Sequence, residues 1–316
     1  MKILITGIAG FIGSNLAKYL LSGQHEVFGV DNFITGSRQN IDLLSDNQGF
    51  RFWKGSVEDF DFTSSVGKVD LIFHLASPAS PVQYIKNPVE TLTANSVGTK
   101  NLLDFMAKTK SDRFVLASTS EIYGDPQVHP QRENYWGNVN PTGERSCYNE
   151  GKRFAEALST TYFRLFGLDI RIARIFNTYG PNMEKDDGRV ISNFICQSLS
   201  EKPITVHGDG LQTRSFCFVS DMVEGLVDLG TKEGLKGAVV NLGNPDERSI
   251  LKMAQLIKQL AATGSKIVFK PKGKDDPARR KPDIGLANKL LGWSPKVALE
   301  DGLKVTIDYF KKRFFR

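Results

Sequence analysis

The sequence predicts a doubly wound α/β fold, in which helices cover both faces of a mainly parallel sheet. In the first 175 residues, short runs that are almost entirely apolar alternate with longer segments of helical periodicity. A strand that is apolar on both sides is buried on both faces, and a helix after each strand lets the next strand pair in parallel. A turn with Gly7, Gly10 and Gly13 lies at the first strand-to-helix junction, where this fold places its tightest loop.

The expected elements of the first part follow in chain order. Nearly apolar strands are expected at residues 2–7, 26–31, 70–76, 113–118 and 169–177. Helices are expected between them at residues 11–23, 97–109 and 148–166. This alternation is typical of βαβ units that build one parallel sheet.

The pattern changes after about residue 176, where glycine, proline and polar loops become frequent. Shorter helices are expected there, at residues 189–201 and 250–264, while residues 216–231 and 238–244 look like elements that return to the first sheet. We therefore predict two interleaved lobes. The first lobe comprises residues 1–175 with 214–243 returning to it, and the smaller second lobe comprises residues 176–213 and 244–316.

Composition excludes several classes of protein. The chain has 316 residues, of which 40% are hydrophobic and 24% charged, as in ordinary globular proteins. The formal net charge is +6, but Lys and Arg are spread along the chain without an aromatic-interleaved basic motif, so no nucleic-acid partner is expected. The basic excess is better suited to attracting an anionic small molecule into a cleft.

The termini and cysteines bear on location and metals. The apolar start is too short for a signal sequence or a membrane span, so no membrane partner is expected. Cys147, Cys196 and Cys217 are odd in number and lack CxxC spacing, which favours a reducing, cytoplasmic location. The histidines at positions 25, 74 and 129 lack metal-ligand spacing, and no metal site is predicted.

The glycine turn and the second strand predict a dinucleotide site. Gly7, Gly10 and Gly13 allow the backbone to approach a pyrophosphate at the positive end of the following helix. Asp31 ends the second strand, close to the offset of about 20 residues at which a carboxylate binds the adenosine ribose. A carboxylate there repels the 2′-phosphate of NADP, so NAD is favoured, although Arg38 could shift this preference. The alternative is a tight turn that serves packing only.

Tyr148 and Lys152 predict a catalytic base. They are four residues apart and therefore share one face of a helix. An ammonium beside a phenol favours the phenolate, so we expect a lowered pKa of Tyr148 and a phenol able to remove a proton from a hydroxyl. The alternative is a surface helix that carries the pair by chance.

The order of these features resembles the extended short-chain dehydrogenase/reductase family over essentially the whole chain. The shared features are the GxxGxxG turn, the acidic residue after the second strand, a Ser/Thr-rich strand end and a downstream YxxxK. The resemblance implies a Rossmann-type first lobe, and it implies that Thr119 helps Tyr148 to polarise the substrate oxygen. It further implies NAD-binding positions, which are Gly7, Gly10, Phe11, Ile12, Gly13, Asp31, Asn32, Thr35, Gly36, Val57, Leu75, Ser77, Asn95, Ala117, Tyr148, Lys152, Thr178 and Arg189.

The stretch ASTSEIYG, residues 117–124, bears on the subfamily. Sugar-nucleotide 4,6-dehydratases carry an Asp–Glu pair for the elimination of water at this place, whereas this chain has Ser120 and Glu121. The 4-epimerases typically carry no carboxylate there. Longer strings, at residues 30–41, 74–92, 129–153, 174–195 and 208–226, closely resemble the UDP-glucuronate decarboxylases (UDP-xylose synthases).

This second resemblance implies decarboxylation of UDP-glucuronate to UDP-xylose and CO2 by way of a 4-keto intermediate. Glu121, with Ser120 before it, would orient the sugar or a water, and Arg214 would hold the carboxylate or a water, because a guanidinium is a poor acid. Tyr84 is expected in a loop that touches the sugar. The other implied substrate-binding residues are Asn177, Asn193, His207 and Arg280, of which Arg280 is expected on the UDP part.

Two departures and three alternatives stay open. His207 stands where these enzymes often have an aromatic residue near the uracil, and Ser56 stands where they usually have an Asp near the adenine. The alternatives are an oxidative decarboxylase that releases the 4-keto pentose, an epimerase or dehydratase acting on another nucleotide sugar, and a non-catalytic NAD-binding regulator. A homodimer is expected, because helices at residues 97–109 and 150–166 are apolar on more than one face.

Overall fold

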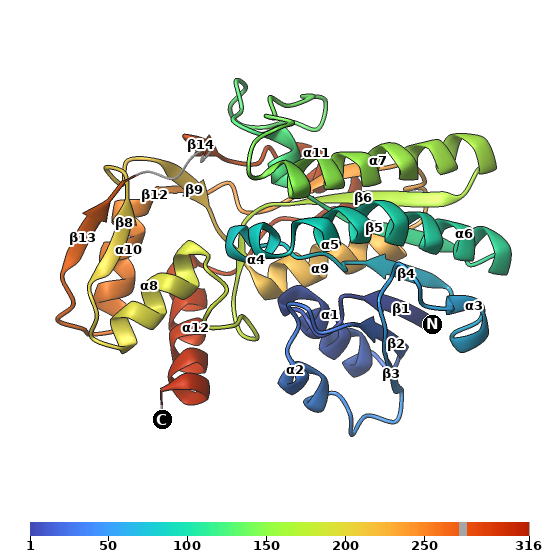
Figure 1. Cartoon of the computed structure of the whole chain (residues 1–316), viewed down its shortest axis with the longest axis horizontal. Helices are drawn as coiled ribbons and strands as arrows, with labels where there is room; N and C mark the ends of the chain where they lie inside the picture. The colour runs from blue at the N-terminus through green and yellow to red at the C-terminus, as the bar shows by residue number, and fades with distance from the viewer. Residues whose placement is uncertain (272–276, 316) are drawn as a thin grey trace.

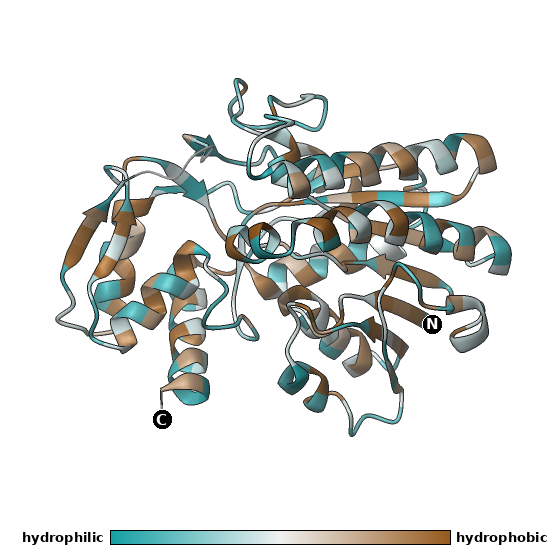
Figure 2. Ribbon diagram, viewed as in Figure 1, coloured by the Kyte–Doolittle hydropathy of each residue, from teal (hydrophilic) through white to brown (hydrophobic). Residues whose placement is uncertain are grey.

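The computed structural model describes residues 1–271 and 277–315. Its centre is a parallel seven-stranded sheet in the order β11-β6-β5-β4-β1-β2-β3 (Figure 1). The strands are β1 (Lys2–Thr6), β2 (Glu26–Asp31), β3 (Phe50–Lys54), β4 (Leu71–His74), β5 (Arg113–Thr119), β6 (Asp169–Ile175) and β11 (Val239–Leu242). The doubly wound α/β class predicted from the sequence is confirmed. Figure 2 shows much of the central strands in brown, as burial on both faces requires.

Helices cover both faces of this sheet. One face packs against α1 (Phe11–Ser22), α9 (Val219–Thr231) and α11 (Gly285–Leu291), and the other against α3 (Phe62–Ser65), α6 (Thr99–Thr109) and α7 (Ser146–Phe166). The remaining elements of this lobe are α2 (Arg38–Asp42), α4 (Pro81–Lys86), α5 (Pro88–Thr93), the π-helical turn η1 (Ala94–Gly98) and the 3₁₀ turn η2 (Ser120–Tyr123).

The second lobe lies beside the carboxyl ends of the strands and has its own apolar core. Its helices are α8 (Val190–Leu199), α10 (Ile250–Leu260) and α12 (Leu299–Phe314). Its strands form three small sheets, in which β8 (Ile204–His207) pairs with β13 (Ile267–Lys270), β7 (Thr178–Tyr179) pairs with β10 (Cys217–Phe218), and β9 (Thr213–Ser215) lies between β12 (Glu247–Ser249) and β14 (Arg279–Arg280).

The chain crosses between the lobes at places that differ from the sequence pattern. The strand β9 belongs to one of the small second-lobe sheets, so the chain returns to the first-lobe core with α9 and not at residue 214. Later, α11 and Trp293 pack into the core beside α9, although the pattern assigns residues 244–316 to the second lobe. The indole of Trp293 donates a hydrogen bond to the Asp221 carbonyl at 2.9 Å, which ties this late segment to α9. Among the described residues, no helix is long and apolar enough to cross a membrane.

Candidate active site

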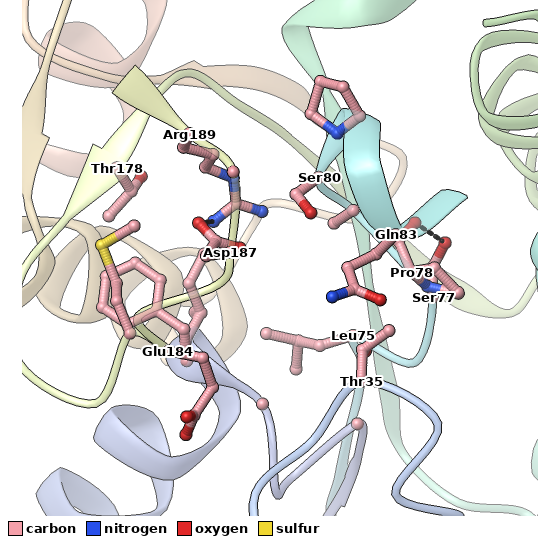
Figure 3. A pocket seen from close by; sticks show the side chains of 18 of the residues that line it. Thr35, Leu75, Ser77, Pro78, Ser80, Gln83, Thr178, Glu184, Asp187 and Arg189 are labelled. Carbon is pink, nitrogen blue, oxygen red and sulfur yellow. Dashed lines mark hydrogen bonds and ion pairs between the residues drawn. The ribbon is translucent and has the colours of Figure 1, made fainter. Parts of the chain in front are cut away.

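A cavity of about 890 Å³ opens between the two lobes, at the carboxyl ends of the central strands. Open α/β sheets bind their ligands at this edge. The cavity is lined by every predicted cofactor-, substrate- and catalytic-site residue except Asn95 and Tyr84. Figure 3 shows Ser77, Pro78, Ser80 and Gln83 on one side of it, and Glu184, Asp187 and Arg189 on the other.

The glycine-rich turn forms a cradle at the start of α1. Gly7 has a φ of 73°, in the left-handed region that favours glycine. A Cβ on Gly13 would lie 2.3 Å from the Gly7 carbonyl oxygen, and one on Gly7 would lie 2.7 Å from the Ala76 nitrogen. The backbone is therefore free of side chains where the positive end of α1 faces the cavity. This cradle fits the pyrophosphate of a dinucleotide.

Asp31 lies beside the cradle at the end of β2. Its two carboxylate oxygens accept hydrogen bonds from the Ala9 amide at 2.9 Å and the Phe33 amide at 2.8 Å. Burial raises the pKa of Asp31, and the two amide hydrogen bonds oppose that rise. The carboxylate is thus held at the place where the sequence predicts the adenosine ribose.

Ser56 joins a polar network farther along this edge. Its hydroxyl accepts a hydrogen bond from the Asn32 amide at 3.3 Å and donates to the Glu58 carboxylate. Glu58 also accepts from the Thr93 hydroxyl at 3.0 Å. Asn32, Ser56 and Glu58 all line the cavity, so a carboxylate is present two residues after the position where the Asp is missing.

Tyr148 and Lys152 lie on one face of α7, both buried against the end of β5. Lys152 Nζ donates a hydrogen bond to the Ala117 carbonyl at 2.7 Å. Burial, and next the charge of Glu121, raise the pKa of Tyr148 to about 12, while a hydrogen bond with Thr119 opposes the rise. Burial lowers the pKa of Lys152 to about 7.

The expected lowering of the pKa of Tyr148 is therefore wrong. The charged form of a buried group is disfavoured, and this acts on the phenolate of Tyr148 and on the ammonium of Lys152 alike. Lys152 does not offset this effect. Burial lowers the pKa of Lys152 itself, and its Nζ donates to the Ala117 carbonyl.

Glu121 is the centre of a charged cluster in the one-turn helix η2. Its Oε1 lies 3.3 Å from Arg280 Nη1 and 3.9 Å from Arg145 Nη1, and its Oε2 accepts from the Tyr84 hydroxyl at 3.4 Å. Arg280 was expected on the UDP part, but its side chain reaches the carboxylate beside Tyr148. Arg145 is not among the residues predicted from the sequence, although it stands three positions before Tyr148, about one helical turn away.

Tyr84 differs from its prediction. It lies in the helix α4, which has Pro81 at its start, and its side chain is fully buried. Its ring stacks on the ring of Tyr148, and Tyr84 does not line the cavity. The prediction that Tyr84 lies in a loop is therefore wrong, because Tyr84 belongs to a short helix that turns its ring toward Tyr148 on α7.

Asn95 is also set back from the cavity. It lies in the π-helical turn η1 and is fully buried, and its amide donates to the Ser77 hydroxyl at 2.9 Å and the Thr91 carbonyl at 2.7 Å. A direct contact with the cofactor is not available to it in this arrangement. Asn95 instead orients Ser77, which lines the cavity.

The second lobe supplies the far wall of the cavity. Arg214, in β9, is buried and donates to its neighbouring Thr213 carbonyl at 2.8 Å. Arg189 Nη1 lies 3.6 Å from Asp187 Oδ2, and burial raises the pKa of Asp187. Asn193 donates to the Gly188 carbonyl at 2.9 Å.

The remaining predicted residues of this wall are Asn177, Thr178 and His207. The Thr178 hydroxyl donates to the Phe176 carbonyl at 2.9 Å, and Asn177 precedes it at the edge of the cavity. His207 is exposed at the end of β8, with Nδ1 lying 3.1 Å from the Pro271 carbonyl oxygen. No cluster of metal-ligating side chains occurs in the parts of the chain that are described.

Comparison with known proteins shows what this arrangement is similar to. Residues 3–243 match the model of the NAD dependent epimerase/dehydratase family. The chain is 51% identical over 311 residues to UDP-glucuronic acid decarboxylase 1 of Xenopus tropicalis, covering 98% of this chain and 72% of that protein. It is 50% identical to UDP-glucuronic acid decarboxylase 6 of Arabidopsis thaliana, covering 99% of this chain and 90% of that protein.

Solved structures of related enzymes superpose on nearly the whole of this chain. The UDP-glucuronic acid 4-epimerase of Bacillus cereus, in complex with UDP-glucuronic acid and NAD, superposes with a TM-score of 0.92 and is 33% identical. The match covers 99% of this chain and 100% of the epimerase. The UDP-glucose 4-epimerase of Thermotoga maritima, with UDP-glucose, superposes with a TM-score of 0.90 at 30% identity and covers 99% of both chains.

Proposed function

Because this chain belongs to the NAD-dependent epimerase/dehydratase family, we propose that it converts UDP-glucuronate to UDP-xylose and CO2 with a bound NAD. The decarboxylases named above support the substrate and the reaction, since they match nearly the full length at about half identity. The observation that carries the proposal is the cluster of Arg280 and Arg145 around Glu121, next to Tyr148. The guanidinium groups at this corner offer charge-assisted hydrogen-bond donors, which suit a sugar that carries a carboxylate.

The proposed cofactor fits the first lobe. The glycine cradle would hold the pyrophosphate, Asp31 the adenosine ribose, and Tyr148 and Lys152 would flank the nicotinamide end. Bound NAD would supply the acceptor for a hydride from C4 of the sugar and the donor for its return, and its nicotinamide would add a positive charge to the site. The cycle then involves no net oxidation of the substrate.

Tyr148 and Thr119 handle the proton and the oxygen at C4. Tyr148 removes the hydroxyl proton as C4 becomes a ketone, which turns the sugar into a β-keto acid. Loss of CO2 leaves the electron pair of the broken bond in an enolate, whose oxygen is stabilised by hydrogen bonds from Tyr148 and Thr119. Protonation at C5 and reduction at C4 complete UDP-xylose. A pKa of about 12 means that Tyr148 keeps its proton until added positive charge favours the phenolate.

The charged residues have positioning roles in this scheme. Arg280, paired with Glu121, would hold the carboxylate or the sugar. Glu121 and Ser120 would orient the ring or a water for protonation at C5. Arg214 faces the cavity from the second lobe and would act electrostatically on the diphosphate or the carboxylate, because a guanidinium does not release its proton. Asn177, Asn193 and Arg189 offer further donors suited to a diphosphate.

We also propose a homodimer that uses the layer of α5, η1 and α7. The helix α5 packs against α7, and large apolar side chains are exposed on both. These exposed side chains are Val89, Leu92, Val97, Phe154, Leu165 and Phe166. An exposed apolar area of this kind is typical of an interface. Analytical ultracentrifugation of the protein and of Phe154→Glu tests this, because the charged variant should sediment as a monomer.

A cytoplasmic location fits the cysteines. Cys147, Cys196 and Cys217 are free, and burial raises the pKa of each thiol. A reducing compartment suits a protein that keeps three thiols in reduced form. Fractionation of the source cells with detection of the protein in each fraction tests this.

One experiment tests the function. Purified protein is mixed with UDP-glucuronate while the absorbance of NADH is followed and the sugar nucleotide is identified by NMR and mass spectrometry. We expect UDP-xylose and no lasting NADH. A 4-keto pentose with stoichiometric NADH would show an oxidative decarboxylase, UDP-galacturonate would show an epimerase, and either would overturn the proposal.

A further inference from the structure

Arg313, in the last turn of α12, joins three segments of the chain at the cofactor side of the cavity. Its Nη2 lies 2.7 Å from a carboxylate oxygen of Glu184 and 3.0 Å from the Ser37 hydroxyl, and its Nη1 lies 3.1 Å from the side-chain oxygen of Asn40. It also donates to the Tyr309 hydroxyl one turn earlier. The Arg313 side chain is only 13% exposed, whereas the side chain of Glu184 is 36% exposed. A second-lobe helix thereby holds the loop that follows Asp31.

The chain around Glu184 is tied to the first lobe on the same side. Asn15 donates to the Pro181 carbonyl at 3.0 Å, and Asn182 donates to the Ser14 hydroxyl at 3.1 Å. Asn15 and Ser14 belong to α1, directly after the glycine cradle. We call residues 181–189 the strap, since this segment runs from α1 across the cavity to Arg189.

The strap lies where a bound dinucleotide must pass. From Asn182 to Arg189 nearly all of its residues line the cavity, as do Ser37 and Asn40, and the Asn40 amide donates to the Asn182 carbonyl at 3.4 Å. Figure 3 shows Glu184 toward the glycine-rich side, with Asp187 and Arg189 farther along the same segment. A cofactor on the cradle would therefore be bordered by the strap and by residues 35–40, and Arg313 binds both segments.

We propose that Arg313 is a positioning residue that holds the strap against residues 35–40, which form the end of the loop after β2 and the start of α2, and so slows dissociation of the cofactor. The effect of Arg313 on the product that the enzyme releases rests on the proposed function. After loss of CO2 the site holds NADH and a 4-keto pentose. If NADH leaves then, the enzyme has carried out a net two-electron oxidation, and it releases the ketone instead of UDP-xylose. Arg313 would thus set the ratio of the two products.

The test compares Arg313→Ala with Lys312→Ala. Lys312 is the neighbouring cation, 72% exposed and paired only with Asp308 at 3.0 Å among the described residues, so its removal changes charge equally without touching the strap. Dissociation of NADH is followed by stopped-flow fluorescence after mixing with excess NAD, with no sugar nucleotide present. A hydrogen bond to a charged group contributes enough that its loss should speed NADH dissociation about tenfold to a hundredfold in Arg313→Ala. Lys312→Ala should match the wild type.

A milder variant covers the case in which Arg313→Ala fails to fold. Glu184→Gln leaves the contacts of Arg313 with Ser37 and Asn40 in place. It removes the negative charge from residue 184, the partner of Arg313 in the strap. It should speed dissociation by a smaller factor, about threefold to tenfold. Unchanged dissociation in a folded Arg313→Ala, or in Glu184→Gln if that is the only folded variant, would overturn the proposal.

The product ratio separates this proposal from the proposed function. With UDP-glucuronate, Arg313→Ala should release more 4-keto pentose per UDP-xylose than the wild type, by about the factor found for dissociation. If no variant acts on UDP-glucuronate, the proposed function fails, while the dissociation rates still decide the role of the strap. If dissociation is unchanged while UDP-xylose forms normally, only the strap proposal fails.

Discussion

The phenol rings of Tyr84 and Tyr148 lie face to face, with their centroids 5.0 Å apart and their planes 4° from parallel. The Tyr84 hydroxyl also donates to Glu121, so one fully buried side chain contacts two residues of the active site. The stack restricts rotation of the Tyr148 ring and thereby directs its hydroxyl toward Thr119. Tyr84 comes from α4, and its position links that helix to the catalytic geometry.

We expect Tyr84→Leu to lower kcat about tenfold with little change in KM. An aromatic pair contributes about 0.5–1.5 kcal/mol beyond its burial, and about 1.4 kcal/mol corresponds to a factor of ten. The variant Tyr84→Phe keeps the ring and loses only the long hydrogen bond to Glu121, so its kcat should stay within about threefold of the wild type. Equal losses in both variants would show that the hydroxyl matters and the stack does not.

Arg280→Gln should remove the preference for a sugar that carries a carboxylate. We expect UDP-glucuronate to bind about tenfold to a hundredfold more weakly, as is typical when a charged hydrogen-bond partner is lost, while UDP-glucose is little affected. Dissociation constants for both nucleotides, measured by calorimetry, test this. Arg248→Gln is the control, because Arg248 pairs with Asp246 on the surface, 50% exposed and away from the cavity. Equal weakening of both nucleotides by Arg280→Gln would place Arg280 on the UDP part instead.

Gly13→Ala should abolish binding of NAD. The added Cβ would lie 2.3 Å from the Gly7 carbonyl oxygen, so the cradle must open to accept it. We expect no rise in melting temperature when NAD is added to this variant, whereas the wild type should be stabilised by its ligand. Gly264→Ala is a matched control, since a Cβ at Gly264 meets nothing within 4 Å. A normal NAD-induced rise in Gly13→Ala would contradict the placement of the pyrophosphate.

The sequence predicted most of the sheet because its buried strands are short apolar runs. It missed β3 (Phe50–Lys54), where Arg51 and Lys54 interrupt the run. This strand lies at the edge of the sheet and pairs only with β2, so part of its surface stays exposed and the apolar pattern weakens. The signal for a strand is therefore strongest where burial is complete.

The parts of the candidate site that were predictable are those where a sequence motif fixes the position of a residue on a strand, turn or helix. The glycine turn, Asp31 and the pair on α7 have fixed spacing, and all of them line the cavity. Tyr84 was misplaced and Arg313 was missed, because their contacts join distant segments of the chain. Arg313 and Ser37, for example, are separated by 276 positions. The pKa of Tyr148 was misjudged for a related reason, because burial is set by the whole fold and not by the nearest charge.

Lys152 should make the stability of the protein rise with pH through a defined window. Its pKa is about 7 in the folded protein against 10.5 for an ordinary lysine. Below about pH 7 Lys152 is protonated in both the folded and the unfolded protein, and burying its charge lowers the free energy of unfolding by the full amount. Between about 7 and 10.5 the unfolded chain binds one more proton than the folded protein, so the free energy of unfolding increases with pH. Lys152→Met lacks this group, and the melting temperature of the wild type should rise relative to that of the variant across the window. Lys312→Met, which removes an exposed lysine, should show a constant difference from the wild type. A constant difference for Lys152→Met as well would mean that the buried lysine keeps its ordinary pKa and can supply full positive charge to Tyr148.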